Sequence, residues 1–293
     1  NLKISNCEFI NAGYGIYGED QNRLDTVLVS GCLFKNLGQS AINFIKGSVA
    51  PGQVNHFICE NSTFWNIKNY AIYIVSNSVT ANPQIDFQVN HITVHDAGNI
   101  NIYPGSIDSA VIKNSIFSSS SSSAYKAFTL YGTNSKAGNV LYYNLDGIGF
   151  ESGATEQQLF NIQANIDPLF ASVSGGNFTL MSGSPAINAG DDGKSLGDSR
   201  WWPENNKDYA FITEGENKIS EALASAIKGQ TIVLTSDGGI YNESSTMVID
   251  KKINIVAADG MNNKPVIQSG SDDAVFELSD DFLLRGVILD GSK

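Results

Sequence analysis

Seven charged or amide side chains are the ones in this sequence that could bind or cleave a sugar chain. They are Lys3, Glu8, Glu60, Gln88, Asn90, Lys113 and Arg285. The cations could hold a carboxylate or stabilise developing negative charge. The two glutamates could exchange protons across a glycosidic bond, and the amides could hydrogen-bond hydroxyl groups. The sequence assigns no catalytic role to any of them, so they are predicted as a substrate-binding set.

Patterns that would bind a metal ion are weak. Three acidic pairs could donate oxygens to calcium: Asp191–Asp192, Asp272–Asp273 and Asp280–Asp281. Turn chemistry is the preferred explanation for these pairs, because aspartate stabilises tight turns through its own backbone. The remaining candidates show no ligand spacing: His56, His91, His95, Cys7, Cys32 and Cys59. No metal site is therefore specified, and calcium is the one cofactor left to test for.

Internal repeats must position the candidate residues. Five copies of one alternating pattern are Leu2–Phe9, Val27–Phe34, Phe57–Phe64, Phe87–Val94 and Ala110–Phe117, and a degenerate sixth ends near Leu145. The last positions of successive copies are 25, 30, 30, 23 and 28 residues apart. Such spacing is typical of one coil of a β-helix per copy, with short strands joined by loops of variable length. The sequence predicts an all-β fold, a right-handed parallel β-helix.

Each copy predicts inward columns interrupted by one bend. Leu2 and Ile4 should point inward, Asn6 should occupy the bend, and Cys7 and Phe9 should point inward again, because strand side chains alternate in direction. The bend positions are Asn6, Gly31, Asn61, His91 and Asn114. Asparagine and glycine tolerate a left-handed backbone, which suits a bend. The aromatic column would be Phe9, Phe34, Phe64, Val94 and Phe117, and the cysteines would be buried thiols.

The same alternation predicts three outward columns on one face. They are Arg285, Ser5, Ser30, Glu60, Asn90, Lys113; then Leu283, Lys3, Leu28, Ile58, Gln88, Val111; then Ile288, Glu8, Leu33, Thr63, Thr93, Ile116. The candidate residues would thus share a face and line a groove. However, Leu28, Leu33, Ile58 and Val111 make the centre of that face apolar. Such a centre is typical of a surface that a loop covers.

The order of segments along the chain is unusual. Ile219, Leu223 and Ile227 form one apolar stripe, which predicts a short amphipathic helix that caps the opening coil of a β-helix. Residues 167–202 instead read as a closing segment, in which Trp201 and Trp202 would cover the last coil. The segment that opens a β-helix therefore comes after the segment that closes one. Three explanations are open: a tandem array cut across two units, a circular permutation, or residues out of native order. We predict coils and closing segment in 1–202, a linker in 203–215, and opening coils in 216–293 that stack on the residue-1 end to complete one solenoid.

The helix, the strands that follow it and the closing segment resemble those of chondroitinase-B-like and alginate-lyase-like proteins of the pectate-lyase-like superfamily. They are also similar to uncharacterised surface β-helix proteins of gut Bacteroidetes. The resemblance implies a secreted or cell-surface protein whose partner is a polysaccharide. In the resembled lyases, lysine, arginine and often calcium act on the outer face of one sheet. The three arginines here are Arg23, Arg200 and Arg285, and no Lys/Arg pair can be placed onto the catalytic positions.

Composition narrows the class of partner. The chain has 30 acidic and 18 basic residues, a net charge of −12. This balance is opposite to that of a nucleic-acid-binding surface. It argues less strongly against a polyanionic glycan, because a local basic groove can override net charge. No apolar run reaches the 18 residues of a membrane-spanning segment.

Three functions fit these observations. The leading hypothesis is a secreted or cell-surface monomer that binds a polysaccharide, with or without catalysis. The first alternative is a polysaccharide lyase that cleaves a uronate-containing glycan by β-elimination, and the second is a structural or adhesin-like solenoid. Because all three share the fold, the fold does not select among them and the question of enzymatic activity stays open.

Overall fold

The structure is a computed structural model that describes residues 1–18, 24–44, 54–76, 86–104, 109–151, 153–206, 208–270 and 274–291. The chain divides into two compact units. Unit 1 comprises Asn1–Pro168 and Pro185–Arg200, and unit 2 comprises Leu169–Ser184 and Trp201–Lys293. Each unit has a hydrophobic core of its own.

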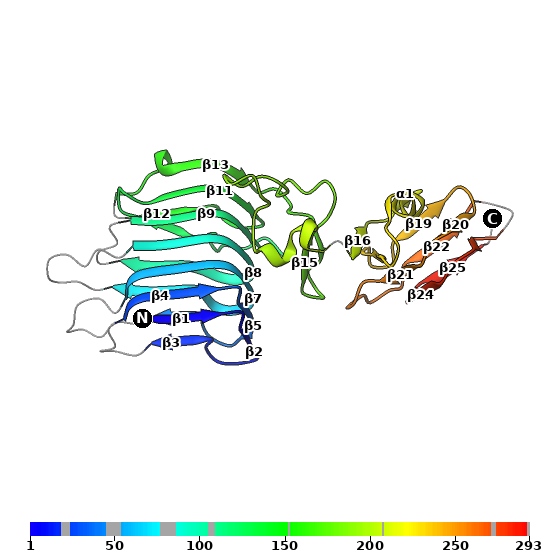
Figure 1. Ribbon diagram of the computed structural model, residues 1–293. Helices are drawn as coiled ribbons and strands as arrows, with labels where there is room; N and C mark the ends of the chain where they lie inside the picture. The colour runs from blue at the N-terminus through cyan, green and yellow to red at the C-terminus, as the bar shows by residue number, and fades with distance from the viewer. Residues whose placement is uncertain are drawn as a thin grey trace. The chain divides into compact units, whose positions relative to one another are not determined.

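Unit 1 is a stack of coils built from parallel strands (Figure 1). One sheet has the order β1 (Leu2–Ser5), β4 (Leu24–Ser30), β7 (Val54–Ser76), β8 (Asp86–Pro104), β9 (Ser109–Ser118), β11 (Lys136–Tyr143) and β13 (Leu159–Ala164). A second face begins with β2 (Glu8–Ile10) and β5 (Leu33–Leu37) and continues into β7. A third face begins with β3 (Ile16–Gly18) and β6 (Ile42–Phe44) and also continues into β7. The remaining elements are β10 (Thr129–Tyr131), β12 (Gly149–Glu151) and the 3-10 turn η1 (Glu156–Gln158). Parallel crossovers of this kind are right-handed, so the predicted right-handed parallel β-helix is confirmed.

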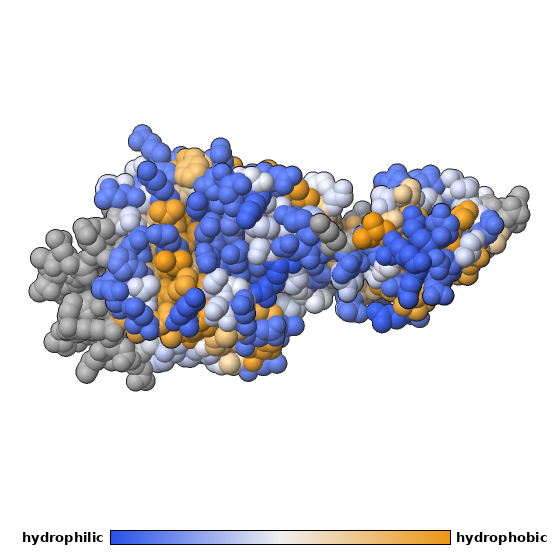
Figure 2. Space-filling model, viewed as in Figure 1, coloured by the Kyte–Doolittle hydropathy of each residue, from blue (hydrophilic) through white to orange (hydrophobic). Residues whose placement is uncertain are grey.

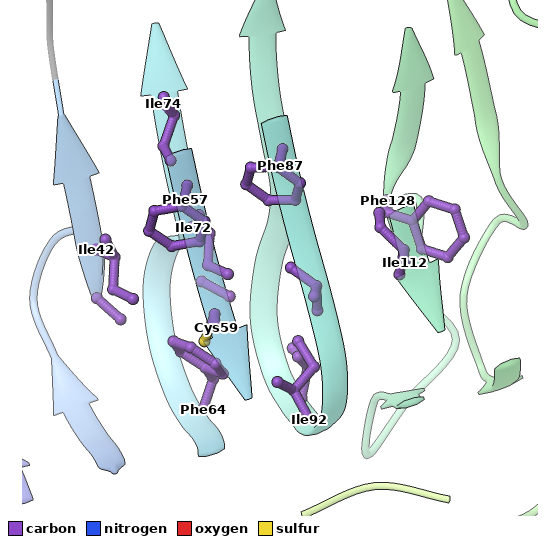
Figure 3. Close-up of a cluster of buried hydrophobic side chains, with 14 of the residues drawn as sticks. Ile42, Phe57, Cys59, Phe64, Ile72, Ile74, Phe87, Ile92, Ile112 and Phe128 are labelled. Atoms are coloured by element: carbon purple, nitrogen blue, oxygen red, sulfur yellow. The ribbon is translucent and has the colours of Figure 1, made fainter. Parts of the chain in front are cut away.

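The predicted inward columns of unit 1 are confirmed by strand register. The aligned sets are Leu2, Val27, Phe57, Phe87, Ala110; Ile4, Val29, Cys59, Val89, Ile112; and Phe9, Phe34, Phe64, Val94, Phe117. The ring of Phe34 lies 4.9 Å from that of Phe9 and 4.9 Å from that of Phe64, nearly parallel to both. Figure 3 shows members of these columns filling the interior between the strands. Burying each such side chain stabilises the fold by about 1.5–3 kcal/mol.

The thiols follow the same pattern with one exception. Cys32 and Cys59 are buried and unpaired, and burial raises the pKa of each thiol. They act as small hydrophobic side chains, as predicted. Cys7 is exposed in the first coil, so the prediction of a buried thiol is wrong at that position.

The bends of the coil lie at residues with a left-handed backbone. All five predicted bend positions have positive φ, from 45° at Asn61 to 66° at Gly31. A second bend column was not predicted: Asn11, Asn36, Asn66, Asp96, Asn144 and Asn165. Its signal was present in the sequence, because Asn11, Asn36 and Asn66 each follow the aromatic-column phenylalanine by two residues. Amide hydrogen bonds run along this column, from Asn66 to Asn36 at 2.9 Å and from Asn36 to Asn11 at 3.1 Å.

The later copies required correction. Tyr142, and not Leu145, aligns with Phe117, and the following strand β13 forms a seventh copy in which Ala164 aligns with Tyr142. These copies were obscured because β11 contains Gly138 and Asn139 where alternation was expected, and because β13 ends on a small residue.

Unit 2 contains a hairpin and a second, shorter stack of parallel strands. The hairpin pairs β14 (Phe170–Ser172) with β15 (Asn177–Leu180). The stack has three faces: β16 (Tyr209–Ile212), β18 (Thr231–Leu234), β21 (Ile253–Ala257), β24 (Phe282–Arg285); β17 (Gly215–Glu216), β19 (Ile240–Glu243), β22 (Val266–Ser269), β25 (Ile288–Asp290); and β20 (Met247–Ile249) with β23 (Phe276–Leu278). The 3-10 turns η2 (Ser199–Trp201) and η3 (Pro203–Asn205) precede the stack.

The predicted amphipathic helix is α1 (Lys218–Ser225), which buries Ile219 and Leu223 against the core of unit 2. Ile227 lies beyond its end and is 55% exposed, so the predicted stripe is one turn too long. The buried carboxylate of Glu243 accepts hydrogen bonds from the backbone N–H groups of Ile219 (2.8 Å) and Ser220 (3.1 Å). A negative charge at a helix N-terminus satisfies free N–H groups and complements the helix dipole. The cap is thus fixed by the adjoining coil. The stacking of residues 216–293 on the residue-1 end stays a prediction.

Candidate functional site

Five of the seven candidate residues lie on the outer side of the sheet that begins with β1, whereas Glu8 lies on β2, beyond the bend at Asn6. Glu60, Asn90 and Lys113 occupy one column on β7, β8 and β9. Lys3 lies on β1, four strands away from Lys113, which corresponds to about 19 Å at the usual strand spacing. The two lysines therefore do not act on the same sugar ring. Arg285 belongs to unit 2.

Most of the polar candidates on this face are already engaged by neighbouring side chains. Ser30 donates to Glu60 at 3.2 Å, Asn114 donates to Asn90 at 3.0 Å, and Gln88 donates to Asp86 at 3.0 Å. Glu8 is exposed in the first coil. Hydrogen bonds between neighbouring strands stabilise the stack and leave fewer groups for a ligand.

Residues 190–200, called the strap here, cross the outward column that contains Thr63 and Thr93. Thr63 and Thr93, on two adjacent strands, are buried. Thr63 donates to a carboxylate oxygen of Asp198 at 2.7 Å, and the Asp198 N–H donates to Thr93 Oγ1 at 3.0 Å. The Gly197 N–H donates to the carbonyl of Asn114 at 2.8 Å. The strap covers Thr63 and Thr93. The apolar residues expected to lie under a loop, Leu28, Leu33, Ile58 and Val111, are each partly exposed. Hydrophobic surface is visible along the stack of unit 1 (Figure 2).

A buried ion pair anchors the C-terminal end of the strap. The carboxylate of Asp198, 1% exposed, lies 2.8 Å from Arg200 Nε, and the guanidinium of Arg200 donates to the carbonyl of Gly31 at 2.8 Å. Burial raises the pKa of Asp198 to about 6, although Arg200 opposes that shift. The strap therefore carries a carboxylate that changes charge near neutral pH.

The N-terminal end of the strap binds two basic side chains. Asp191 accepts from Lys113 at 3.0 Å and from Asn114 at 2.7 Å, and these bonds lower the pKa of Asp191. Asp192 lies 3.0 Å from His91 Nε2. Burial raises the pKa of Asp192, but the Lys194 N–H and His91 outweigh it and lower that pKa overall. A glycan carboxylate would have to displace Asp191 to reach Lys113.

The three acidic pairs proposed for calcium have other surroundings. Asp191 and Asp192 bind basic groups of the protein. The N–H of Asp281 and the ammonium of Lys228 lower the pKa of Asp280. The pair Asp272–Asp273 lies outside the described residues. Within the described part of the chain, no three or more His, Cys, Asp or Glu side chains are grouped to hold a metal ion. No helix among those residues is long and apolar enough to cross a membrane.

Unit 2 contains a cleft of about 290 Å³, called the aromatic cleft here. Its floor is the outward column Phe211, Val233, Val256 and Arg285, which the parallel register brings side by side on β16, β18, β21 and β24. Its further lining includes Ser172, Gly175, Asn177, Thr179, Trp201, Asn206, Tyr209 and Asp259. Arg285 is therefore a candidate residue that lines this cleft.

The aromatic cleft combines ring faces with hydrogen-bonding groups. Tyr209 is 51% exposed, and its ring stacks on that of Phe211 at 6.0 Å. Trp201 contacts the edge of the buried Phe178 at 5.6 Å, which fixes the indole at the wall of the cleft. No described carboxylate forms an ion pair with Arg285. The volume lies near the lower end of the usual range for small-molecule sites, ~300–1,000 Å³.

Sequence reasoning missed the aromatic cleft. Tyr209 and Phe211 alternate along one strand and so share a face, which was a readable signal in residues expected to be a linker. Trp201, for which the sequence predicted only a position over the last coil, also lines the cleft. His56, expected in a loop, lies within β7.

Comparisons with known proteins found a similarity in structure but none in sequence. No protein-family model matches the chain, and no curated protein sequence matches it. Among solved structures it is similar to the PL6 family alginate lyase AlyGC, with 17% identity and a TM-score of 0.40. The match covers 99% of this chain and 41% of the lyase, so the chain spans less than half of that protein's length. By its own strand pairing, the chain is an all-β, right-handed parallel β-helix protein.

Proposed function

We propose that this protein is a secreted or cell-surface β-helix protein that binds a polysaccharide in the aromatic cleft and does not cleave it. The observation that carries the proposal is the combination, in one cleft, of Trp201, Tyr209 and Phe211 with Arg285. Aromatic faces are apolar and electron-rich, so they pack against the C–H faces of sugar rings. Convergent amide, hydroxyl and guanidinium groups can then hydrogen-bond the ring hydroxyls.

The outer face of unit 1 gives less support to the lyase alternative. A β-elimination needs a base for the proton next to the carboxylate, a cation for the developing charge and a proton donor for the leaving oxygen. On this face, Lys113 is held by Asp191, and Lys3 is four strands away from it. The third function, a structural solenoid, has no need of a cleft lined with aromatic rings.

Binding is tested with the full chain on a panel of alginate, chondroitin sulfate, pectin and mixed β-glucan. Affinity gel electrophoresis and calorimetry measure binding, and the ultraviolet absorbance of unsaturated uronate measures elimination. The informative variants are Tyr209→Ala and Arg285→Gln. Their matched controls are Tyr125→Ala, an exposed tyrosine in unit 1, and Lys264→Gln, an exposed cation in unit 2.

We expect at least one polysaccharide to bind without forming unsaturated product. Tyr209→Ala should weaken that binding about tenfold, because one ring–sugar contact is worth on the order of 1 kcal/mol, and both controls should bind normally. Unsaturated product would establish the lyase instead. The assignment to the aromatic cleft would be overturned if no polysaccharide of the panel binds. It would also be overturned if Tyr209→Ala and Arg285→Gln leave binding unchanged.

A further inference from the structure

The third face of unit 1, formed by β3, β6 and the end of β7, carries two pairs of tyrosines. The rings of Tyr14 and Tyr17 lie 4.8 Å apart, and those of Tyr70 and Tyr73 lie 4.7 Å apart. Strand register places Tyr17 and Tyr73 on either side of Asn43, so their strands are two spacings, about 10 Å, apart. Tyr14 is 39% exposed and Tyr17 is 46% exposed. Solvent therefore reaches part of the surface of these two rings.

Asn43 lies between the two pairs and is the unusual residue of this face. It alternates with Ile42 and Phe44, which are both buried in the core, so its side chain belongs to the outer side of the coil. It is nevertheless only 5% exposed, and among the described residues nothing donates a hydrogen bond to its Oδ1 atom. A buried, unsatisfied amide oxygen costs about 1–3 kcal/mol, so native structures rarely keep one without a reason.

We propose that the tyrosines and Asn43 form a second sugar-binding site, specific for a neutral pyranose. Aromatic rings would pack against the C–H face of the sugar, and a sugar hydroxyl would donate to Asn43 Oδ1 once the half-exposed Tyr17 turns aside. None of the five side chains carries a charge at neutral pH, which favours an uncharged sugar over a uronate. Ser40, also buried, lies three residues before Asn43 and adds no charge.

This inference rests on the proposed function in one respect, that the ligand is a polysaccharide. The location of the second site is independent of the aromatic cleft. The aromatic cleft belongs to unit 2 and contains Arg285 and Asp259, whereas the tyrosine site belongs to unit 1 and is uncharged. The two sites therefore differ in the ligands they should prefer and in the variants that should abolish them.

The test titrates the full chain with cellohexaose, xylohexaose, mannohexaose and an alginate hexamer in a calorimeter. The decisive variant is Asn43→Leu, which keeps the size of the side chain and removes the unsatisfied oxygen. We expect this variant to have a higher Tm than the parent, because it removes a buried oxygen that accepts no hydrogen bond. It should bind the neutral hexamer about tenfold more weakly, because the acceptor for the sugar hydroxyl is gone. Tyr17→Ala should weaken the same binding about tenfold, while Tyr125→Ala and Tyr209→Ala should not.

A purely structural role for Asn43 would change Tm and leave the affinity as it was, which would overturn the proposal. Binding of a neutral hexamer that Tyr209→Ala abolishes and Tyr17→Ala preserves would overturn it as well, because the sugar would then occupy the aromatic cleft. If the alginate hexamer binds and no neutral hexamer does, the second site is disproved and the proposed function stands. If no sugar binds at all, both fail.

Discussion

At the scale of single residues, asparagine determines where each coil turns. Asn36 has φ 54°, donates to Asn11 and accepts from Asn66. Asparagine adopts the left-handed region more readily than other residues with a Cβ atom, and its amide also links coils. One residue thus satisfies a backbone requirement and a hydrogen-bonding requirement together.

Substitution of Asn36 separates these two contributions. Asn36→Gly keeps the left-handed backbone and loses the amide bonds, whereas Asn36→Ala loses both. We expect Asn36→Ala to be the less stable variant by about 1 kcal/mol, since alanine is strained in this region. Urea denaturation of the two variants measures the difference, and equal stabilities would show that the backbone angle contributes nothing.

The charge of Asp198 makes stability depend on pH. Its folded pKa, about 6, lies above the ordinary value of 3.8 because of burial. The folded state therefore binds this proton more tightly than the unfolded state, and the stability that results is lost as pH rises through about 6.

Comparison with Asp198→Asn isolates this effect from other titrating groups. The free energy of unfolding of the parent minus that of the variant should fall by about 2 kcal/mol between pH 4 and pH 7. Urea melts of both proteins at each pH measure it. A difference that rises with pH would mean that the pairing with Arg200 outweighs burial.

At the scale of elements, the strap is held by side chains and backbone carbonyls from successive coils. Thr63, Thr93 and the carbonyls of Gly31 and Asn114 all bind it. None of these groups lies in the strap itself, so its position depends on the register of the strands beneath. This arrangement explains why an acidic loop lies flat on a sheet.

Thr63→Val should loosen the strap without disturbing the coils. The variant keeps the shape of the side chain but removes the donor to Asp198, leaving a buried acceptor short of one hydrogen bond, at a cost of about 1–3 kcal/mol. Hydrogen exchange should become faster in residues 190–200 and stay unchanged in β7 and β8. Thr133→Val, at an exposed position, is the control. Unchanged exchange in the strap would show that other contacts hold it.

At the scale of the whole molecule, two stacks of coils each enclose a core. The strand β24 of unit 2 repeats the pattern of the first copy: Phe282 and Leu284 match Leu2 and Ile4, and Gly286, with φ 76°, matches the bend at Asn6. This match motivates the prediction that residues 216–293 stack on the residue-1 end. It also motivates the expected monomer, in which that stacking occurs within one chain.

A cysteine pair tests the stacking. Ser5→Cys with Arg285→Cys, in a Cys7→Ser background, should form an intramolecular disulfide under dilute oxidising conditions, because neighbouring positions in a parallel column lie within bonding reach. Ser5→Cys with Lys228→Cys is the control and should remain reduced. Gel mobility under non-reducing conditions distinguishes an internal bridge from a dimer. The absence of any internal bridge would contradict the prediction.

The sequence by itself determined the coil. Alternation, copy length and the bend residues define a parallel β-helix, because a coil must repeat its inward pattern wherever it contacts its neighbour. That logic predicted the columns of Phe9 and Ile4. It failed at Tyr142 and at β13, where glycine, asparagine and polar residues weaken the alternation.

Only the tertiary structure decided what the outward side chains do. The strap brings Asp191 and Asp198 to Lys113 and Thr63 across more than 70 residues of sequence, and no local pattern encodes such a contact. The aromatic cleft likewise needs Trp201 and Arg285, from separate segments, on one surface. Periodicity specifies which side of a strand a residue occupies, whereas the packing of the loops specifies whether that side is covered or open to a ligand.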